Sequence, residues 1–574
     1  MTLKLLTAAV LLIALSAIAR GQAKPSAQKP AEPTRGTISG KVTNENGQPM
    51  AGASAFVRPV NSPGAGRSTV TDADGNFQVN NLDPALYTVG ANAPAYTTMP
   101  SDPSTPTFYR IGDSVNLQLV RGGVITGSVT NSLGEPLVAV RVRATRIRDP
   151  KGTSARLPYV YFLEQSTDDR GIYRIYGLAP GTYLVSAGGY GSQSYNFNPY
   201  DSDVPTYAPS STRDDAAEVN VSAGEETSVD IRYRGEQGHT ISGTVKVAGT
   251  NGSSVSLVPA GGTIMPATST FQPPGARGFA FNGVSDGEYV LIAEEYAPTA
   301  GISPMMTVSE PKRVVVKGAN VSGVELTPIP LASITGRLVL QASKITECQG
   351  KRPPLLSETL VQLRRPEVDP EKEGPAFRRN YGTTASPDAN GAFTLRNVSP
   401  GKYQFEPRFY ARYWYLQSIT LGAAPASGLR SQTSRASDAA ANWTTVKSGD
   451  QLNNLTITVA EGAASIHGKT TVADPPISTT LFLVPAEPDK ADDVLRFFVT
   501  GIAADGTFAL NNLPPGRYWL LTQTNPDAQL AKLTKLREPE AATARTKLRR
   551  SAETQKNQIE LKPCQNLADY QLKQ

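Results

Sequence analysis

Short runs in which apolar and polar residues alternate recur along the whole chain, and turn-forming residues separate these runs. Near the C-terminus, Phe508, Leu510 and Leu513 precede a Pro-Pro-Gly sequence, and Tyr518 then begins a second apolar run. Alternation with a period of two places every other side chain on one face of a β-strand. This segment therefore predicts a strand, a tight turn and a returning strand.

The same segment occurs five times, and in every copy the first aromatic residue precedes the second by ten residues. Five matches to one spacing indicate that a single β unit is repeated along the chain. The aromatic pairs are Phe77 and Tyr87, Tyr173 and Tyr183, Phe279 and Tyr289, Phe393 and Tyr403, and Phe508 and Tyr518.

Each unit opens with a strand that carries a glycine at a fixed position. A glycine inside a strand indicates a close backbone approach or a bulge. The Asp-Gly and Asn-Gly pairs before the first aromatic residue predict type I′ hairpin turns, because Gly and Asn tolerate a positive φ. The opening glycines are Gly40, Gly127, Gly243, Gly336 and Gly468.

A further alternating strand ends four of the units, only a few residues before the next unit opens. These strands lie at 115–119, 229–233, 324–326 and 455–459. Connections this short predict a semi-rigid rod of domains.

Composition supports an all-β chain with several domains. The 574 residues are enough for units that each bury a core. Gly 50, Pro 45 and Tyr 22 are high counts, whereas His 2 and Cys 2 are very low, which is typical of all-β modules. We expect a signal peptide at 1–23, a disordered linker at 24–34, and β-sandwich repeats at 35–120, 121–235, 236–329, 330–460 and 461–574.

The last repeat is expected to include a helical C-terminal segment. Residues 528–537 and 540–555 are rich in helix-forming residues, and Pro539 separates them. Alternation resumes at 559–561 and at 567–572, so we expect the tail to complete the fifth sandwich. A solvated helix face is predicted for the dense basic cluster of Arg545, Lys547, Arg549 and Arg550.

The Gly-x-Val sequence near the start of a unit, with Asp-Gly-x-Phe and Leu-x-Pro-Gly-x-Tyr near its end, resembles the carboxypeptidase regulatory-like domain. The resemblance covers most of residues 35–525 and is clearest in the first, second and fifth units; the third lacks the Asp-Gly and Leu-x-Pro elements. It implies a tandem array of about five transthyretin-like Greek-key β-sandwiches. Multi-repeat secreted bacterial proteins of this family are similar throughout, and some classifications group the domain with a carbohydrate-binding-like fold.

The N-terminus predicts export. One basic residue, Lys4, precedes an apolar run at 5–18 and then small residues, as in a secretory signal peptide cleaved near Ala23. Residues 24–34 have no apolar periodicity and predict a disordered spacer. No later apolar run approaches the roughly 20 residues that a membrane-spanning helix needs. We therefore expect no transmembrane segment, and a secreted, periplasmic or cell-surface location.

Cys348 and Cys564 are the two cysteines of the chain. In an oxidising compartment they are expected to form a disulfide, which would tie the final segment to the fourth repeat across a long loop. The alternative is a pair of free thiols.

The sequence favours a protein without enzyme activity, metal site or cofactor. A zinc carboxypeptidase needs two histidine ligands and a glutamate, in a separate catalytic domain. The two histidines, His239 and His467, lie beside opening strands of different repeats, and no Gly-x-Ser-x-Gly nucleophile elbow is present. Asp72 and Asp74 resemble the start of a calcium loop, but the remaining ligands are absent and a hairpin turn is the better interpretation.

Aromatic residues in the second repeat are the candidate ligand-binding residues. Tyrosines in loops stack on sugar rings, and neighbouring Asn and Asp residues bind sugar hydroxyls. A second aromatic cluster, at 409–415, alternates along a strand, so one of its sides is expected in the core. The candidates are Tyr190, Tyr195, Phe197, Tyr200 and Tyr207, in a stretch rich in Gly, Ser, Asn and Pro.

These observations support a secreted, non-catalytic β-sandwich repeat protein that binds an extracellular ligand, with carbohydrate as the first hypothesis. The alternative is a structural or adhesive cell-envelope spacer that binds protein partners, and a regulatory subunit of a separate envelope enzyme or transporter is a third. A glycan binder should expose coplanar aromatic rings, whereas a spacer should bury them. The basic residues form no stripe interleaved with aromatics, so no nucleic-acid partner is expected.

Overall fold

The structure is a computed structural model. It describes residues 35–60, 66–98, 107–152, 162–189, 198–247, 251–260, 268–297, 305–348, 353–366, 384–422, 437–470, 479–524, 527 and 530–572. The predicted signal peptide and linker lie outside the described residues.

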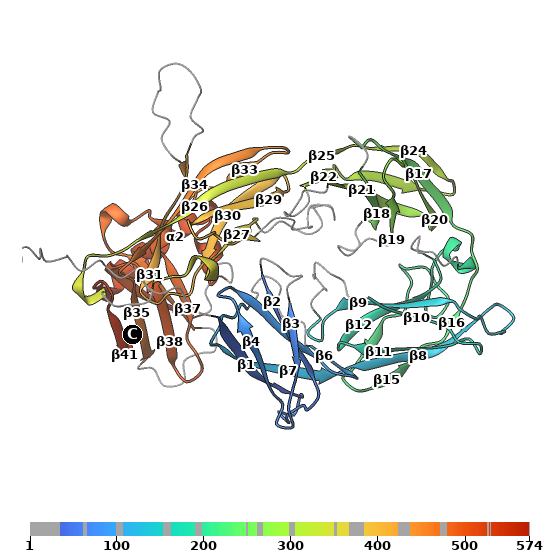
Figure 1. The fold of residues 1–574 in the computed structure, drawn as a ribbon, viewed down its shortest axis with the longest axis horizontal. Coiled ribbons are helices and arrows are strands. Elements are labelled where there is room, and N and C mark those ends of the chain that lie inside the picture. Colours follow the sequence, from blue (N-terminus) through green and yellow to red (C-terminus); the bar gives the residue numbers. More distant parts are fainter. Residues whose placement is uncertain are drawn as a thin grey trace, which may run out of the picture.

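Five β-sandwiches follow one another along the chain, as expected from the repeated pattern (Figure 1). The elements of the first are β1 (Gly36–Thr43), β2 (Ser54–Pro59), β3 (Arg67–Val70), β4 (Asn76–Leu82), β5 (Tyr87–Asn92), β6 (Tyr96–Thr98) and β7 (Ser114–Arg121).

Two sheets enclose the core of the first sandwich. In one sheet β1 lies between β4, with which it pairs antiparallel, and β7, with which it pairs parallel. In the other sheet β2 lies between β3 and β5. Alternate residues of both sheets, among them Ile38, Val57 and Val79, point inward and are buried. The alternation in the sequence is thus the inward and outward alternation of a sandwich.

The other four sandwiches repeat this order. The second contains β8 (Gly123–Thr130), β9 (Arg141–Arg148), β10 (Phe162–Ser166), β11 (Ile172–Leu178), β12 (Gly181–Ala187), η2 (Pro199–Ser202), β13 (Thr206–Tyr207), β14 (Val219–Val221), β15 (Glu226–Ser228) and β16 (Ile231–Arg232). The third contains β17 (His239–Val245), β18 (Ser253–Pro259), β19 (Thr268–Gln272), β20 (Gly278–Val284), β21 (Gly287–Ala297), β22 (Met305–Ser309), β23 (Lys312–Val316) and β24 (Val321–Leu326), and β25 (Pro328–Pro330) connects it to the fourth.

The fourth sandwich contains β26 (Ala332–Gln341), η3 (Thr346–Cys348), η4 (Leu356–Glu358), β27 (Leu360–Arg364), β28 (Thr384–Ala385), β29 (Ala392–Val398), β30 (Gly401–Arg408), β31 (Trp414–Leu421), β32 (Ser437–Asp438), β33 (Thr444–Val446) and β34 (Gln451–Glu461). The fifth contains β35 (Ala464–Thr470), β36 (Thr479–Pro485), η6 (Pro488–Lys490), η7 (Val494–Arg496), β37 (Phe498–Gly501), β38 (Thr507–Leu513), β39 (Gly516–Thr524), α1 (Leu533–Leu536), η8 (Pro539–Ala541), α2 (Ala542–Gln555), β40 (Gln558–Leu561) and β41 (Asn566–Leu572).

Two neighbours lie very close to the opening glycine of every repeat, as predicted for a close approach. A Cβ on Gly40 would lie 2.1 Å from the carbonyl oxygen of Val115 on the closing strand and 2.7 Å from the ring of Phe77. The same two kinds of neighbour, the closing strand and the first aromatic ring, crowd Gly127, Gly243, Gly336 and Gly468. Only a residue without a side chain allows the opening and closing strands to pair while the aromatic ring fills the core.

The second aromatic residue of each repeat is also held in one way. The hydroxyl of Tyr518 donates to the carbonyl oxygen of Pro514, four residues earlier, at 2.8 Å, and its ring is fully buried. The equivalent bonds are Tyr87 to Asp83, Tyr183 to Ala179, Tyr289 to Ser285 and Tyr403 to Ser399. The spacing of ten residues that recurs in the five repeats therefore has two structural roles. It places one ring against the opening glycine and one hydroxyl where it closes the turn.

The turns before the first aromatic residue differ from the predicted type I′ geometry. That type requires a positive φ at both central residues. Here Gly75 has φ +75°, whereas Asp74 does not have a positive φ. The Asp72 carboxylate instead accepts hydrogen bonds from the N–H groups of Asn76 and Asp74, and these bonds lower its pKa. Asp72 thus serves the turn, in agreement with the hairpin interpretation.

The C-terminal tail completes the fifth sandwich, as predicted, because β40 pairs with β39 and β41 pairs parallel with β35. The predicted helices are present, although α1 is shorter than the expected segment. The solvated face predicted for the basic cluster is wrong for Arg545, which is 8% exposed and donates to the carbonyl oxygens of Leu536 and Glu538. Arg549 is half-buried and donates to the carbonyl oxygen of Pro485.

The repeats form a closed ring, and the predicted rod is wrong. In Figure 1 the first sandwich, in blue, lies beside the fourth and fifth sandwiches, in yellow to red. Arg110 of the first repeat donates to the carbonyl oxygen of Tyr410 in the fourth, at 3.4 Å. Short connections do restrict each junction, but the angles at successive junctions turn the chain back on itself.

Replacing an opening glycine should destabilise its repeat. In Gly468→Ala the new Cβ would lie 2.3 Å from the carbonyl oxygen of Tyr570, so we expect a loss of about 2 to 3 kcal/mol in the free energy of unfolding of the fifth repeat, measured in urea. The control Gly501→Ala meets no atom within 4 Å and should change stability by less than about 0.5 kcal/mol. Equal effects of the two variants would contradict the packing role of Gly468.

Candidate functional site

Two of the five aromatic residues predicted to bind a ligand, Tyr200 and Tyr207, lie in the described part of the chain. The structure brings them to different surroundings, one against a sandwich core and one in a cleft. The other three, Tyr190, Tyr195 and Phe197, lie outside the described residues.

Tyr200 packs inside the second repeat. It lies in η2, where its N–H donates to the Asn198 side chain at 3.0 Å. Its ring meets that of Tyr233 edge-on, with the centroids 5.5 Å apart, and it packs against the core of the second sandwich. The polar stretch in the sequence is thus tied to the sandwich by an aromatic contact.

Tyr207, on β13, lines a cleft of about 430 Å³ between the second and third repeats. The junction below the cleft is firmly held, because the buried Asp203 accepts hydrogen bonds from Tyr233 at 2.9 Å and from Gln237 at 2.8 Å. The other lining residues are Val204, Pro205, Thr212, Arg213, Asp214, Glu236, Gln237, His239, Pro259, Ala260, Ser285, Asp286, Gly287, Glu288 and Tyr289.

Most charges of this cleft are paired, but two are available. His239 Nε2 lies 3.2 Å from Asp286 Oδ1, and Glu236 accepts from Arg234 Nε at 2.9 Å. The side chains of Arg213 and Asp214 form no hydrogen bond or ion pair with any residue that the structure describes. The cleft therefore presents a free donor group, a free acceptor group and an aromatic wall, and its lining contains more carboxylates than cations.

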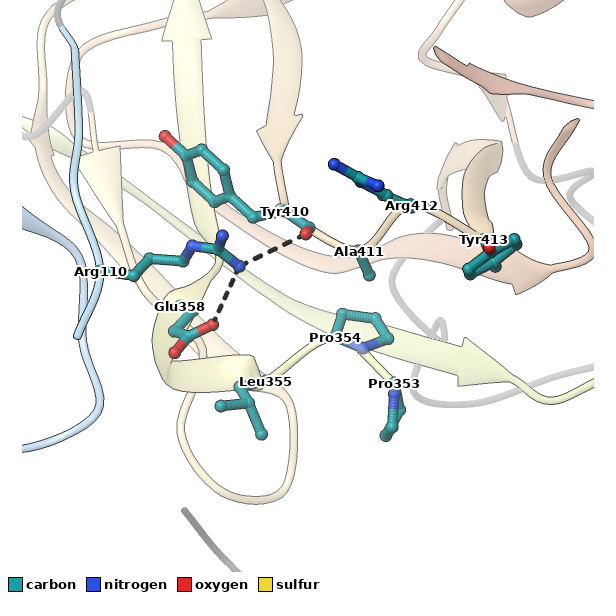
Figure 2. Close-up of a pocket in the computed structure, with 9 residues that line it drawn as sticks. All are labelled: Arg110, Pro353, Pro354, Leu355, Glu358, Tyr410, Ala411, Arg412 and Tyr413. Carbon is teal, nitrogen blue, oxygen red and sulfur yellow. Dashed lines mark hydrogen bonds and ion pairs between the residues drawn. The ribbon is translucent and has the colours of Figure 1, made fainter. Parts of the chain in front are cut away.

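A second pocket lies where the ring closes, between the first and fourth repeats (Figure 2). The guanidinium of Arg110 lies 5.0 Å from the centroid of the Tyr410 ring and 3.7 Å from a carboxylate oxygen of Glu358, which is buried. The Tyr410 hydroxyl in turn lies 3.5 Å from the carbonyl oxygen of Phe108. The pocket has a volume of about 230 Å³.

The aromatic cluster at 409–415 is fixed by the fifth repeat. Asn512 donates from one amide nitrogen to the carbonyl oxygens of Ala411 and Trp414, both at 2.7 Å. The Trp414 ring is buried, and Tyr413 packs against the core of the fourth sandwich. As expected, one side of this cluster belongs to the core.

Arginines from the helical segment and from the fourth repeat join the last two sandwiches. Arg364 forms ion pairs with Glu538 at 2.6 Å and with Glu406 at 2.8 Å. Arg537 lies over the Phe498 ring, and burial lowers its pKa to about 10. The sequence interpretation missed these contacts, because isolated arginines in a polar segment carry no periodic signal.

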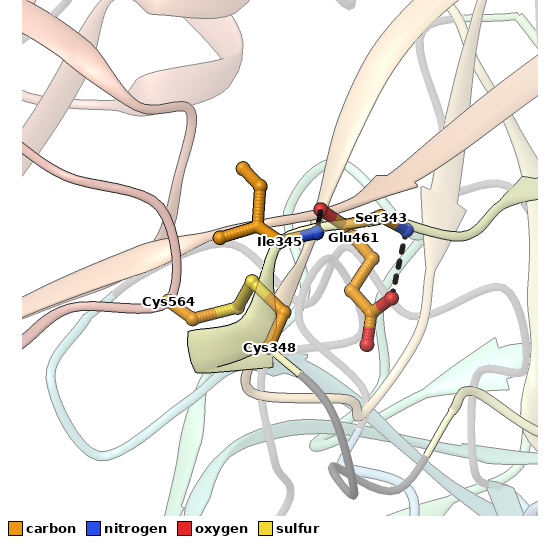
Figure 3. The surroundings of a disulfide bond; sticks show 5 residues. All are labelled: Ser343, Ile345, Cys348, Glu461 and Cys564. Atoms are coloured by element: carbon orange, nitrogen blue, oxygen red, sulfur yellow. Dashed lines mark hydrogen bonds between the residues drawn. A yellow bond between two sulfur atoms is a disulfide. The ribbon is translucent and has the colours of Figure 1, made fainter.

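Cys348 and Cys564 form a disulfide between the end of η3 and the segment before β41 (Figure 3). Cys348 is fully buried, and the two Cα atoms lie 5.4 Å apart. The N–H of Cys564 also donates to the carbonyl oxygen of Gly462 at 3.0 Å, and that of Ser343 to Glu461 at 2.8 Å. The fourth and fifth repeats are therefore joined by a covalent bond.

Residues 37–104 match the family model of the carboxypeptidase regulatory-like domain. The match lies within the first repeat. The other four repeats share its strand order and its opening glycine, which supports the resemblance noted from the sequence. No curated protein matches the sequence.

Solved structures similar to this chain include pilins. The shaft pilin SpaA from Lactobacillus rhamnosus GG is 10% identical, with 35% of this chain and 98% of that chain covered and a TM-score of 0.17. The major pilin BcpA of Bacillus cereus is 12% identical over 51% of this chain and 98% of that chain, with a TM-score of 0.14. The minor pilin GBS52 of Streptococcus agalactiae is 12% identical over 34% and 95%, with a TM-score of 0.20. At these TM-scores we draw nothing about function from the pilins.

Within the described ranges of the chain, no three His, Cys, Asp or Glu side chains lie close enough together to hold a metal ion. His467 lies on the exposed face of β35, with Nε2 3.0 Å from Asn511. His239 lies in the cleft described above. No described helix is long and apolar enough to cross a membrane.

Removing the disulfide should destabilise the fourth and fifth repeats. The bond spans 216 residues, so the double variant Cys348→Ser, Cys564→Ser should lower the free energy of unfolding of the fourth and fifth repeats by about 3 to 5 kcal/mol in the chain-entropy model. Denaturant unfolding with and without a reductant measures this loss. The reductant should destabilise the unsubstituted protein and leave the double variant unchanged; an equal effect on both would rule out a stabilising bond.

Proposed function

We propose that this protein is a secreted, non-catalytic scaffold of the cell envelope, a structural or adhesive spacer whose repeats bind protein partners. The observation that carries this proposal is the closure of the ring by Arg110, Glu358 and Tyr410. Closure, together with the disulfide-linked last repeats, gives five small domains a fixed mutual arrangement. A fixed arrangement suits a protein that holds or spaces its partners.

The use of the aromatic residues also supports a scaffold. Tyr200 packs against the core of the second sandwich, Trp414 lies in that of the fourth, and Tyr410 stacks on Arg110 at the closure. A surface that binds sugars by stacking needs such rings exposed. Among the described rings of the two predicted clusters, Tyr200, Tyr413 and Trp414 pack in or against sandwich cores, whereas Tyr207 lines the cleft between the second and third repeats.

Export supports an envelope location. The basic residue, apolar run and small residues at 1–23 have the pattern of a secretory signal peptide. A disulfide between distant segments suits an oxidising compartment.

The scaffold proposal is tested by opening the ring in producing cells. Arg110→Ala removes the contacts to Glu358 and Tyr410, and should weaken closure by about 1 to 2 kcal/mol. Mild crosslinking of intact cells should place the unsubstituted protein in a high-mass envelope assembly, and the variant should lose most of that assembly. The control Lys402→Ala removes an exposed charge of the fourth repeat, and this variant should retain the envelope assembly.

Two results would contradict the scaffold. One is a protein that protease treatment of intact cells and fractionation place in the cytoplasm. The other is an envelope assembly that forms equally well with Arg110→Ala, once fluorescence energy transfer between labels on the first and fourth repeats has shown that this variant opens.

Carbohydrate binding is a second candidate, favoured by the cleft between the second and third repeats. Its lining combines the Tyr207 ring and prolines with the unpaired side chains of Arg213 and Asp214. A neutral sugar ring needs an apolar face and both donors and acceptors.

A glycan array with the mature protein, residues 24–574, tests this second candidate. Binding of a neutral glycan should fall at least about tenfold in Arg213→Ala, Asp214→Ala, because both hydrogen-bonding groups are lost. The matched control Lys151→Ala, Asp169→Ala removes two exposed charges of the same repeat and should bind normally. Absence of binding to every glycan, or equal binding by both double variants, would remove this cleft as a sugar site.

A further inference from the structure

The pocket at the ring closure is built by two repeats that are distant in sequence. Arg110 comes from the segment before β7 of the first repeat, and the remaining lining residues come from the fourth. They belong to two loops, one at 353–358 and one at 410–413. The pocket is therefore complete only while the ring is closed, because Arg110 leaves it when the first repeat moves away (Figure 2).

Arginine nitrogens without partners line this pocket. Nε of Arg110 is buried and has no hydrogen-bond acceptor in the described part of the chain. Arg412, from the same loop as Tyr410, forms no hydrogen bond or ion pair with any described residue, and in Figure 2 its side chain extends toward Tyr410. Glu358 is the single carboxylate among the lining residues, and Arg110 also lies 3.9 Å from Asp113 outside the pocket, so Arg412 is the lining cation without a described partner. Donor groups of this kind bind a carboxylate best, because guanidinium and carboxylate match in shape and charge.

The walls of the pocket are flat and apolar. Pro353, Pro354 and Leu355 form one wall, and the ring of Tyr413 contributes to the other (Figure 2). Flat apolar walls fit the apolar face of a pyranose ring.

A peptide would find few backbone partners here. The carbonyl oxygen of Tyr410 accepts from Arg110, that of Ala411 from Asn512, and that of Tyr413 from the N–H groups of Gly462 and Ala463. The two prolines have no N–H to donate. Strand addition by an acidic peptide therefore has no free edge in this pocket.

We propose that this pocket binds a uronate residue of an acidic polysaccharide, with the sugar carboxylate between Arg110 and Arg412 and the sugar ring against the proline and tyrosine walls. This site goes beyond the scaffold function and is separate from the cleft that contains Tyr207. Because Arg110 and Arg412 belong to different repeats, the ligand binds the closed ring in preference to an open one. Uronate binding therefore stabilises closure, by mass action on the closed state.

Calorimetric titration of the mature protein with trimers of galacturonate, glucuronate and mannuronate tests the site. The fully methyl-esterified galacturonate trimer is the matched ligand control, because it keeps the sugar rings and loses the charges. At least one uronate trimer should bind, and its neutral ester should bind at least about tenfold more weakly. Raising the salt concentration should weaken the binding of the uronate and leave the binding of the ester unchanged.

Variants locate the binding within the molecule. Arg412→Ala should weaken the uronate at least about tenfold without opening the ring, since Arg412 has no described partner to lose, and Arg412→Lys should retain part of the affinity. Arg396→Ala, an exposed arginine of the same repeat, should bind as the unsubstituted protein does. Energy transfer between labels on the first and fourth repeats measures ring closure. With the uronate present, this transfer should be lower in Arg110→Ala than in the unsubstituted protein.

Several outcomes would overturn this site. They are no binding of any uronate trimer, equal binding of the methyl ester, full affinity in Arg412→Ala, or binding of a Glu-rich peptide in place of the sugars. Each differs from failure of the scaffold function, which is decided by the envelope assembly, and from failure of the neutral-sugar cleft, which is decided by Arg213 and Asp214.

Discussion

The structure depends on one contact that recurs in all five repeats: a glycine on the opening strand, covered by the first aromatic ring and by a carbonyl oxygen of the closing strand. Because the glycine has no side chain, the closing strand can pair parallel with the opening strand while the ring fills the space below it. The closing strand then leads into the next opening strand after very few residues. The same contact that builds each sandwich thus also limits how far one sandwich can turn relative to the next.

The junctions between repeats depend on a different chemistry. Arginines stack on aromatic rings or reach buried carboxylates, as Arg110 does at Tyr410 and Glu358, and as Arg364 does at Glu538. Long arginine side chains cover apolar surface with their stems and place a planar donor group at the end. Small β-sandwiches have little apolar surface to spare, so polar junctions of this kind join them without exposing hydrophobic patches when a junction opens.

Much of the fold could be predicted from the sequence, because strand alternation, the glycine position and the aromatic spacing are local and repeat five times. The return of the tail to β35 followed from the same alternation. Ring closure could not be predicted, since it depends on the sum of several junction angles and on Arg110 and Tyr410, which no pattern marks as neighbours. For the same reason the burial of Arg545 was missed: its acceptors are carbonyl oxygens, which the sequence does not distinguish. Of the predicted ligand-binding tyrosines, Tyr207 lines a cleft because the third repeat folds against it, and a single repeat's sequence contains no information about that neighbour.

Small-angle X-ray scattering of the monomeric mature protein tests the central claim, the closed ring, most directly. The ring predicts a pair-distance distribution with a short maximum dimension and a large share of distances that join repeats one and four, and it matches the curve calculated from the structure. A rod of five sandwiches predicts an asymmetric distribution with a long tail and a maximum dimension close to the summed lengths of the repeats. A curve of that second kind at low protein concentration would contradict the closed ring, and with it the fixed arrangement on which the scaffold function rests.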